Sequence, residues 1–289
     1  MTGRGEPRVL LDGLAMPESP RWHDGRLWFS NWGAEEIVAV DLDGNSEVVD
    51  RGPDGAGWAA NWLPDGRMLI TGSELVRVEP DGSRARHADL SHLSPHGWSE
   101  MTVDGRGNVY VNSLNFDFAD FEAVLSSGRA PGKIALVRPD GDVLEVADGI
   151  AFPNGMVVTP DNDTLIVAES FASRLTAFDI AADGTLSRRR VWADGVGPDG
   201  ICLDAEGCIW ASSGAMINDC ARIREGGEVL DTIELDRPCF AAMLGGPERR
   251  TLFMLTAEWR GTEGMEEVIR ARTGRILVAD APAPGVGWP

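Results

Sequence analysis

Four short stretches of the sequence place an oxygen-bearing side chain beside an apolar run: Glu18 in MPESPRW, Ser99 in GWSEMTV, Asn154 in FPNGMVV and Asp199 in GPDGICLD. Taken alone, Asp199 is typical of a turn, because an aspartate between proline and glycine hydrogen-bonds its own backbone. Two carboxylates and an amide brought together would instead repel one another unless a cation lay between them. Glu18, Asn154 and Asp199 are therefore candidate metal ligands.

The ligand types indicate which ion such a site would take. Oxygen ligands favour a hard divalent cation, so we expect calcium, with magnesium or manganese as alternatives. Zinc is possible but less well suited without histidine or cysteine. The sequence therefore predicts one divalent cation as cofactor.

The elements that must bring these side chains together form a sixfold repeat. Its units, found by aligning the DG-type turns that precede short β-rich runs, open at Met16, Gly57, Gly97, Phe152, Gly197 and Arg237. A spacing of about 40 to 55 residues is typical of propeller blades of four antiparallel strands. We therefore predict an all-β fold, a six-bladed β-propeller. The oxygen-bearing side chains would begin the inner strands of their blades and converge near the axis.

The N-terminal segment predicts how this propeller closes. The last unit supplies three strands, ending in GRILVADA, whereas PRVLLDG near the N-terminus is an unassigned strand. Placing Arg8 to Leu11 as the outer strand of the last blade removes an open sheet edge. Residues 1–289 are then predicted to form a single propeller domain.

The composition argues against several classes of partner. The chain has 26 Lys and Arg against 46 Asp and Glu, a formal charge of -20, which opposes binding to nucleic acid or an anionic membrane. No stretch reads as a signal peptide or a transmembrane helix, so we expect a cytoplasmic protein. The four cysteines show no CxxC spacing and the four histidines no HExxH pair. The oligomeric state is left open.

On these motifs the sequence resembles the SMP-30/gluconolactonase/luciferin-regenerating-enzyme family of calcium- or zinc-dependent six-bladed propellers that hydrolyse lactones. The likeness spans essentially the whole chain, and PESPRW, FPNG and PDGICLD are its most specific carriers. The resemblance implies that Glu18, Asn154 and Asp199 hold the metal. It also implies that Asp199 serves as the catalytic general base and that a small lactone is the substrate.

The third unit departs from this resemblance. Members that hydrolyse sugar lactones typically carry an arginine, one further residue and then Asn-Asp, whereas this chain has Gly97 and Ser99 in GWSE. A serine hydroxyl can still bind a ligand, but the guanidinium fork for a polar sugar is missing. Apolar surface is instead offered by Trp98, Phe116, Phe118 and Trp259, which favours a less hydroxylated or aryl-bearing lactone.

Two insertions are long for hairpin loops, residues 113–132 and 257–273, and each contains a stretch of helical composition. Between the second and third strands of a blade they would rise over the metal and form a lid, unless they only pack on neighbouring blades. The predicted substrate-binding residues are Ser99, Asn112, Asn115, Phe116, Trp259 and Arg260.

The sequence thus predicts a metal-dependent lactonase or esterase, a carboxylic ester hydrolase. Two alternatives remain open. One is a phosphotriesterase-like hydrolase, because the same cation polarises a P=O group. The other is a propeller that binds a ligand without turnover, and only an assay separates it from an enzyme that holds the same metal.

Overall fold

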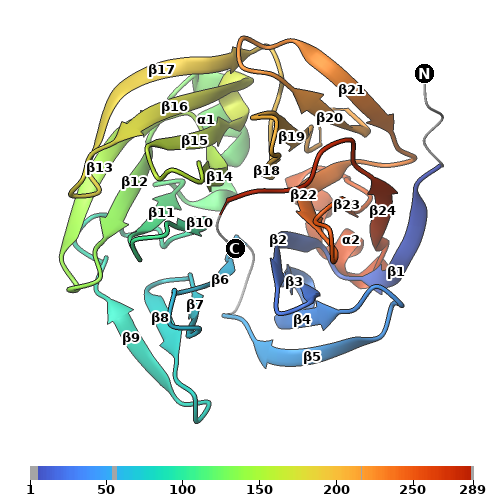
Figure 1. Cartoon of the computed structure of the whole chain (residues 1–289), viewed down its shortest axis with the longest axis horizontal. Helices are drawn as coiled ribbons and strands as arrows, with labels where there is room; N and C mark the ends of the chain where they lie inside the picture. The colour runs from blue at the N-terminus through green and yellow to red at the C-terminus, as the bar shows by residue number, and fades with distance from the viewer. Residues whose placement is uncertain (1–5, 54–56, 216, 288–289) are drawn as a thin grey trace. The chain divides into compact units, whose positions relative to one another are not determined.

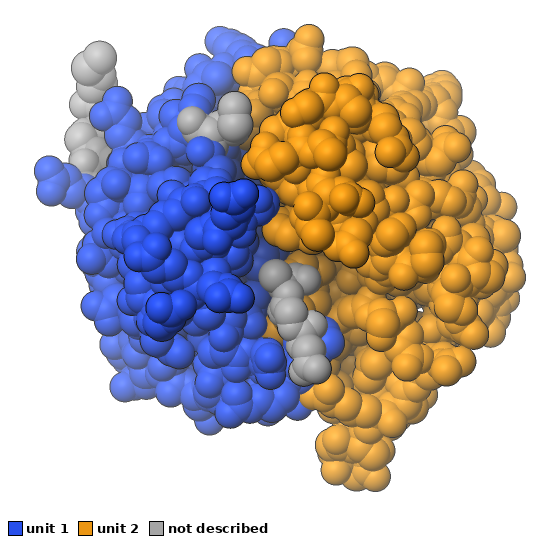
Figure 2. All heavy atoms as spheres, turned by 180° about the vertical axis from the view of Figure 1, so that it is seen from behind, with its two compact units in different colours: residues 1–56, 199–286 blue, residues 57–198, 287–289 orange. Residues whose placement is uncertain are grey.

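The computed structural model describes residues 6–53, 57–215 and 217–287, and the chain divides into two compact units (Figure 2). Unit 1 comprises Met1–Ala56 with Asp199–Val286, and unit 2 comprises Gly57–Pro198 with Gly287–Pro289. The strands form six four-stranded antiparallel sheets, three in each unit, which we number 1 to 6 by their first strands β2, β6, β10, β14, β18 and β22 (Figure 1). The predicted all-β class with six four-stranded sheets is confirmed. That residues 1–289 act as a single domain stays a prediction.

Unit 1 contains sheets 1, 5 and 6. Sheet 1 consists of β2 (Pro17–His23), β3 (Arg26–Asn31), β4 (Glu36–Val40) and β5 (Ser46–Arg51). Sheet 5 consists of β18 (Ile201–Leu203), β19 (Ile209–Ser212), β20 (Asp219–Ile223) and β21 (Val229–Glu234). Sheet 6 consists of β22 (Cys239–Gly245), β23 (Thr251–Thr256), β24 (Gly274–Asp280) and β1 (Arg8–Leu14). The side chains of Leu27, Trp210 and Phe253 show how all three sheets contribute to one buried core.

Unit 2 contains sheets 2, 3 and 4. Sheet 2 consists of β6 (Ala60–Trp62), β7 (Met68–Ile70), β8 (Leu75–Val78) and β9 (Arg84–Ala88). Sheet 3 consists of β10 (Met101–Val103), β11 (Val109–Ser113), β12 (Gly132–Val137) and β13 (Val143–Ile150). Sheet 4 consists of β14 (Pro153–Val158), β15 (Thr164–Glu169), β16 (Arg174–Ile180) and β17 (Leu186–Asp194). One apolar cluster joins sheets 2 and 3, and a second joins sheets 3 and 4.

The predicted role of the N-terminal strand is confirmed. Strand β1 pairs antiparallel with β24 and becomes the outer strand of sheet 6 (Figure 1). Leu10 and Leu11 pack against the core of unit 1, and Arg272 Nε donates a hydrogen bond to the carbonyl of Gly13 at 2.7 Å. Backbone pairing and apolar burial therefore both hold this strand.

Both long insertions contain a helix, as their composition predicts. The connection from β11 to β12 holds η2 (Phe118–Asp120) and α1 (Phe121–Ser127), and that from β23 to β24 holds η4 (Thr262–Gly264) and α2 (Met265–Ala271). Two further short turns, η1 (Trp32–Ala34) and η3 (Ser170–Ala172), follow β3 and β15. Among the described residues, no helix is long and apolar enough to span a membrane.

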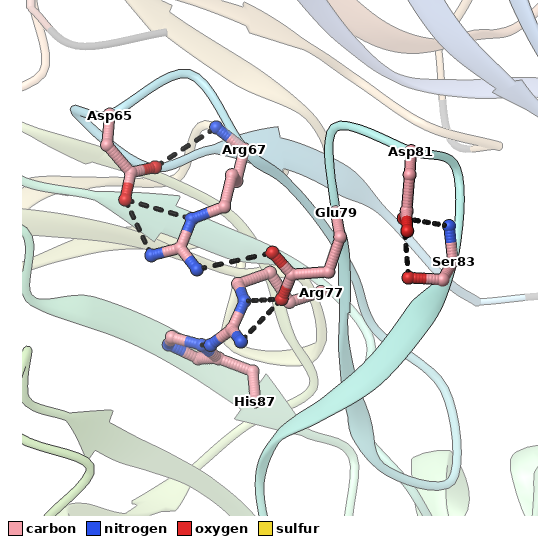
Figure 3. A network of polar contacts seen from close by, with 7 residues as sticks. All are labelled: Asp65, Arg67, Arg77, Glu79, Asp81, Ser83 and His87. Carbon is pink, nitrogen blue, oxygen red and sulfur yellow. Dashed lines mark hydrogen bonds and ion pairs between the residues drawn. The ribbon is translucent and has the colours of Figure 1, made fainter.

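A chain of charged side chains runs over sheet 2 (Figure 3). Arg67 pairs with Asp65 at 2.6 Å and reaches Glu79 at 3.5 Å, and Arg77 contacts Glu79 at 2.5 Å. Arg77 NH1 also lies 3.3 Å from Nδ1 of His87. Arginine can only donate, so Nδ1 must accept and the ring is neutral in this arrangement. Burial, together with the charges of Arg77 and Arg67, lowers the pKa of His87.

Candidate functional site

In unit 1, Glu18 is delivered by a strained segment of backbone. The Glu18 side chain is 3% exposed, and its Oε2 accepts a hydrogen bond from the Ser19 amide at 2.8 Å. Met16, two residues earlier, has a left-handed φ of 63°, which costs a non-glycine residue about 1 kcal/mol or more. Asn31, at the end of β3, accepts the Ala15 amide through Oδ1 at 2.7 Å. A residue at the end of β3 thus holds the backbone just before β2, the strand that carries Glu18.

In unit 2, Asn154 is delivered in the same way. Phe152, two residues earlier, has a left-handed φ of 59°. Glu169, at the end of β15, accepts the Ala151 amide through Oε2 at 2.8 Å. The Ser170 amide donates to the Phe152 carbonyl and the Phe171 amide donates to the Ala151 carbonyl, so three hydrogen bonds hold the backbone before Asn154. Sheets 1 and 4 therefore present their predicted ligands through matching local structures.

Glu169 is fully buried and ionised within a network of donors. Burial acts to raise the pKa of Glu169, but hydrogen bonds from the Ala151 amide and Thr176, together with the charges of Arg189 and Arg174, outweigh it and lower the pKa. Arg174 and Arg189 each lie 3.0 Å from Oε1. The anchor of the Asn154 segment is therefore a fixed carboxylate.

In unit 1, the segment of Asp199 has the same order of residues as those of Glu18 and Asn154: a residue with left-handed φ, then a proline, then the candidate ligand. Gly197 has a φ of 49°, Pro198 follows, and the Asp199 amide donates to the carbonyl of Ser212 at 2.8 Å. Gly214 faces the Asp199 carboxylate, where a side chain would collide with it. The turn interpretation explains the backbone, but it gives no reason why the carboxylate packs directly against a residue without a side chain.

Sheet 3 places Ser99 and Asn112 differently from one another. Ser99 is half-buried and lies two residues before β10, and its amide donates to the carbonyl of Asn112. Asn112 is fully buried: Oδ1 accepts the Glu100 amide at 3.1 Å and Nδ2 donates to the carbonyl of Asn154 at 2.8 Å. Asn112 therefore holds the backbone of a candidate ligand, a contact that the sequence did not predict. Its predicted binding of substrate stays a prediction.

Asn115 and Phe116 lie in the insertion between β11 and β12. Asn115 donates from Nδ2 to the carbonyl of Pro131 at 3.1 Å and so braces the two ends of the insertion. Phe116 is 8% exposed and packs 6.0 Å from Phe152 and 6.5 Å from Phe171, measured between ring centroids. Phe116 and Trp98, both of which we predict from the sequence to offer apolar surface, are instead buried: Phe116 packs on those two rings, and Trp98, at 3% exposure, packs into the core of sheets 2 and 3.

Trp259 and Arg260 lie in the insertion of sheet 6. Trp259 is half-buried and its ring lies 5.9 Å from that of Phe240. Arg260 is exposed and pairs with Glu258 at 3.0 Å and with Glu267. Its guanidinium is thus already committed to carboxylates, whereas Trp259 remains partly exposed as a residue.

Each insertion packs on the short turn beside a candidate ligand of its own unit. In unit 2, Phe121 of α1 lies 5.1 Å from Phe171 of η3 and 5.4 Å from Phe152. In unit 1, α2 packs on η1, where Gly33 leaves room for the side chain of Ile269. The insertion of sheet 3 therefore contacts Phe152, two residues before Asn154, and the η3 turn. The insertion of sheet 6 contacts the η1 turn, which follows the second strand of the sheet that carries Glu18. Whether they act as a lid stays a prediction.

The predicted ligands fit a hard cation in their chemistry. Glu18 and Asp199 offer carboxylates and Asn154 offers an amide oxygen, and the missing side chain of Gly214 leaves room for the carboxylate of Asp199. In the ranges that the structure describes, no group of three or more His, Cys, Asp and Glu side chains is arranged to hold a metal ion. The predicted set of Glu18, Asn154 and Asp199 has only two such side chains, because its third member is an asparagine amide.

A family model, the SMP-30/Gluconolactonase/LRE-like region, matches residues 16–258. The chain belongs to this family. The match begins at Met16 and includes the segments of Glu18, Asn154 and Asp199.

Individual relatives of this SMP-30/gluconolactonase-like chain carry the names of hydrolases. It is 25% identical over 206 residues to a diisopropyl-fluorophosphatase from Loligo vulgaris, covering 62% of this chain and 65% of the relative. It is 27% identical over 226 residues to a pentonolactonase from Haloferax volcanii, covering 71% of this chain and 69% of the relative. The chain spans from 19% to 87% of the length of the first relatives it matches.

A solved structure shows the fold. The calcium-binding protein regucalcin from Agrobacterium tumefaciens superposes with a TM-score of 0.79 at 21% identity, covering 98% of this chain and 96% of that protein. With six four-stranded sheets, the fold is the six-bladed β-propeller that the repeat predicts.

Four residues around the candidate ligands were missed by the sequence reasoning: Asn31, Glu169, Ser170 and Gly214. For Asn31, Glu169 and Ser170 the sequence repeat contained a signal that could have found them. Aligning FSNWGAEE with VAESFASR, by the same repeat that found the strands, places Asn31 beside Glu169 and Trp32 beside Ser170. No comparable pattern marks Gly214.

Proposed function

We propose that this protein is a divalent-metal-dependent hydrolase that opens a lactone or a related cyclic ester, with Glu18, Asn154 and Asp199 as metal ligands. Membership of the SMP-30/gluconolactonase family and the similarity to a pentonolactonase support the reaction class. The observation that carries the assignment is the shared presentation of the three residues, each two positions after a left-handed residue and one after a proline. At Met16 and Phe152 this conformation is strained, and such strain persists where the surrounding structure holds it and concentrates at functional sites, whereas Gly197 adopts it without strain.

The chemistry divides between the cation and the chain. A bound divalent cation supplies a Lewis acid that polarises the ester carbonyl. Asp199 accepts a proton from water while the water oxygen forms a bond to the carbonyl carbon. The bond from that carbon to the ring oxygen then breaks, and the proton passes to the leaving oxygen. The products are the open hydroxy acid and the regenerated carboxylate of Asp199.

A second candidate reaction is hydrolysis of a phosphotriester or fluorophosphate. The similarity to a diisopropyl-fluorophosphatase favours testing it. The same Lewis-acid chemistry applies to a P=O group, so the two reactions need no difference in the metal ligands.

A lactone panel assayed with several added divalent ions, after chelation and dialysis, tests the proposal. We expect turnover to return with calcium or another hard cation. Glu18→Ala and Asn154→Ala should each lower the affinity for that cation, measured by isothermal titration calorimetry, by about 10-fold or more. Unchanged stoichiometry and affinity in both variants would rule out the ligand set.

Asp199→Asn separates binding from catalysis. The amide keeps an oxygen of nearly the same shape but loses the basic carboxylate, so metal affinity should fall modestly while kcat falls by about 10²-fold or more. Asp194→Asn, the same change at an exposed position of β17, is the matched control. Full turnover by Asp199→Asn with metal bound would leave Asp199 as a turn residue. Metal binding without turnover of any panel member by the unmodified chain would favour the non-catalytic alternative.

A further inference from the structure

A hydroxyl lies next to the amide of Asn154 in unit 2. Ser170, the first residue of η3, donates from Oγ to the carbonyl of Pro198 at 2.8 Å. The same Oγ accepts from Nδ2 of Asn154 at 3.5 Å. Pro198 is the residue that precedes Asp199 in the chain.

These two contacts determine which end of the Asn154 amide faces Ser170. A serine hydroxyl has one proton, and a carbonyl oxygen can only accept. Since the Ser170 proton is directed to Pro198, the Ser170 oxygen can only accept a hydrogen bond from Asn154. The NH2 group of the amide must therefore face Ser170, and Oδ1 must point away from it.

The backbone of Asn154 is held independently of this contact. Asn112 Nδ2 donates to the Asn154 carbonyl at 2.8 Å, and Glu169 holds the preceding segment through the Ala151 amide. Within the part of the chain that the structure describes, no donor hydrogen-bonds Oδ1 of Asn154. The remaining freedom of the residue is rotation of its amide, and Ser170 restricts that rotation.

We infer that Ser170 is a positioning residue that turns the Oδ1 of Asn154 toward the bound cation. This inference rests on the proposed function, because it takes Asn154 as a metal ligand. An amide turned the other way would present its NH2 group to the cation, which an oxygen-seeking ion does not bind. Residues that orient a ligand from behind typically change metal affinity by about 10- to 100-fold when they are removed.

Sheet 1 supplies a natural comparison. Its candidate ligand, Glu18, is a carboxylate in which either oxygen can bind a cation, so it needs no group to choose between an oxygen and an NH2 group. The residue of sheet 1 that corresponds to Ser170 is Trp32, because the Trp32 amide bonds the Met16 carbonyl as the Ser170 amide bonds that of Phe152. Tryptophan has no hydroxyl. The hydroxyl is therefore found in the sheet whose ligand has two unlike ends.

A double-mutant cycle in the full chain tests this role. Calcium affinity is measured by titration calorimetry for Ser170→Ala, Asn154→Asp and the double variant, together with the melting temperature of each metal-free protein. We expect Ser170→Ala to weaken calcium binding by about 10-fold or more. In the Asn154→Asp background the same change should cost much less, because either carboxylate oxygen then serves.

The control is Ser127→Ala, which also removes a hydroxyl that donates to a backbone carbonyl, that of Val124, but in helix α1. It reports the general cost of losing such a bond, and we expect it to leave calcium affinity unchanged. Unchanged affinity in Ser170→Ala, or the same loss with asparagine and with aspartate at position 154, would overturn the inference while leaving the proposed function intact. Absence of divalent-cation binding by the unmodified chain would overturn the proposed function and, with it, this inference.

Discussion

A Cβ atom on Gly214 would lie 2.6 Å from Oδ2 of Asp199. Gly214 has a φ of +53° and forms an isolated bridge with Cys239, so its backbone is fixed beside the carboxylate. Atoms that are not bonded do not approach so closely, so any side chain here requires the Asp199 carboxylate to move. The glycine therefore preserves the position of the carboxylate that we propose as general base.

Gly214→Ala should reduce metal affinity and kcat together, because the methyl group displaces the Asp199 carboxylate. It should also lower stability by about 1 kcal/mol, since alanine is strained at a left-handed φ. Gly207→Ala separates the two effects: Gly207 has a φ of +74°, but a methyl group there would meet none of the described residues within 4 Å. We expect similar losses of melting temperature in both variants and a loss of activity in Gly214→Ala alone. Equal activity in the two would show that the carboxylate tolerates the displacement.

The contrast between Glu18 and Ser170 shows what the sequence can and cannot reveal. The position of Glu18 follows from local patterns, because DG-type turns and strand-like runs recur at a regular spacing and define equivalent places in each sheet. The role of Ser170 depends on Pro198 and Asn154, which are 28 and 16 residues away and approach it only in the folded chain. Asn112 illustrates the same limit: its residue type suggested a ligand-binding side chain, but both ends of its amide bond the backbone.

The Arg77–His87 contact predicts a dependence of stability on pH. Burial, together with Arg77 and Arg67, lowers the pKa of His87 in the folded state below the 6.5 expected for the unfolded chain. On acidification the unfolded state therefore binds the proton first, and the stability present at neutral pH is lost progressively as the pH falls below 6.5 toward the lower pKa of the folded state.

His87→Gln should remove this component of the pH dependence. The urea midpoint of the unmodified protein should fall more steeply between neutral and mildly acidic pH than that of the variant. His92→Gln, at an exposed histidine, is the control and should retain the steeper dependence. Parallel curves for all three proteins would contradict the assignment to His87.

Strand β1 should be needed for the stability of unit 1. Deleting residues 1–13 removes the backbone partners of β24 and the packing of Leu10 and Leu11 on the core, and it leaves a new sheet edge. We expect a large fall in melting temperature. Val9→Thr, at a side chain that is 48% exposed on the same strand, should melt like the unmodified protein. A truncated chain with an unchanged melting temperature would show that this pairing contributes little.

Sheet 3 and the insertion that follows β11 together predict the preferred substrate. Gly97 has a φ of +76°, and a Cβ there would lie 3.0 Å from the carbonyl of Gly72, so the backbone disfavours any side chain at this position. With no arginine at position 97 and only the hydroxyl of Ser99 two residues later, a polyhydroxylated lactone leaves hydroxyls unpaired on binding, at about 1 to 3 kcal/mol each. The same insertion carries Phe118, which is 40% exposed and packs 5.4 Å from Phe121.

We therefore expect kcat/KM to be higher for aryl-bearing or sparsely hydroxylated lactones than for gluconolactone, measured at one pH with one metal and corrected for spontaneous hydrolysis. Phe118→Ser should reduce this preference by lowering kcat/KM for the aryl-bearing substrates, because it removes an accessible aromatic ring. Leu125→Ser, which changes another exposed apolar side chain of the same insertion, should leave the preference unchanged. A clear preference of the unmodified protein for gluconolactone would contradict the prediction and would mean that donors other than an arginine at position 97 pair with the sugar hydroxyls.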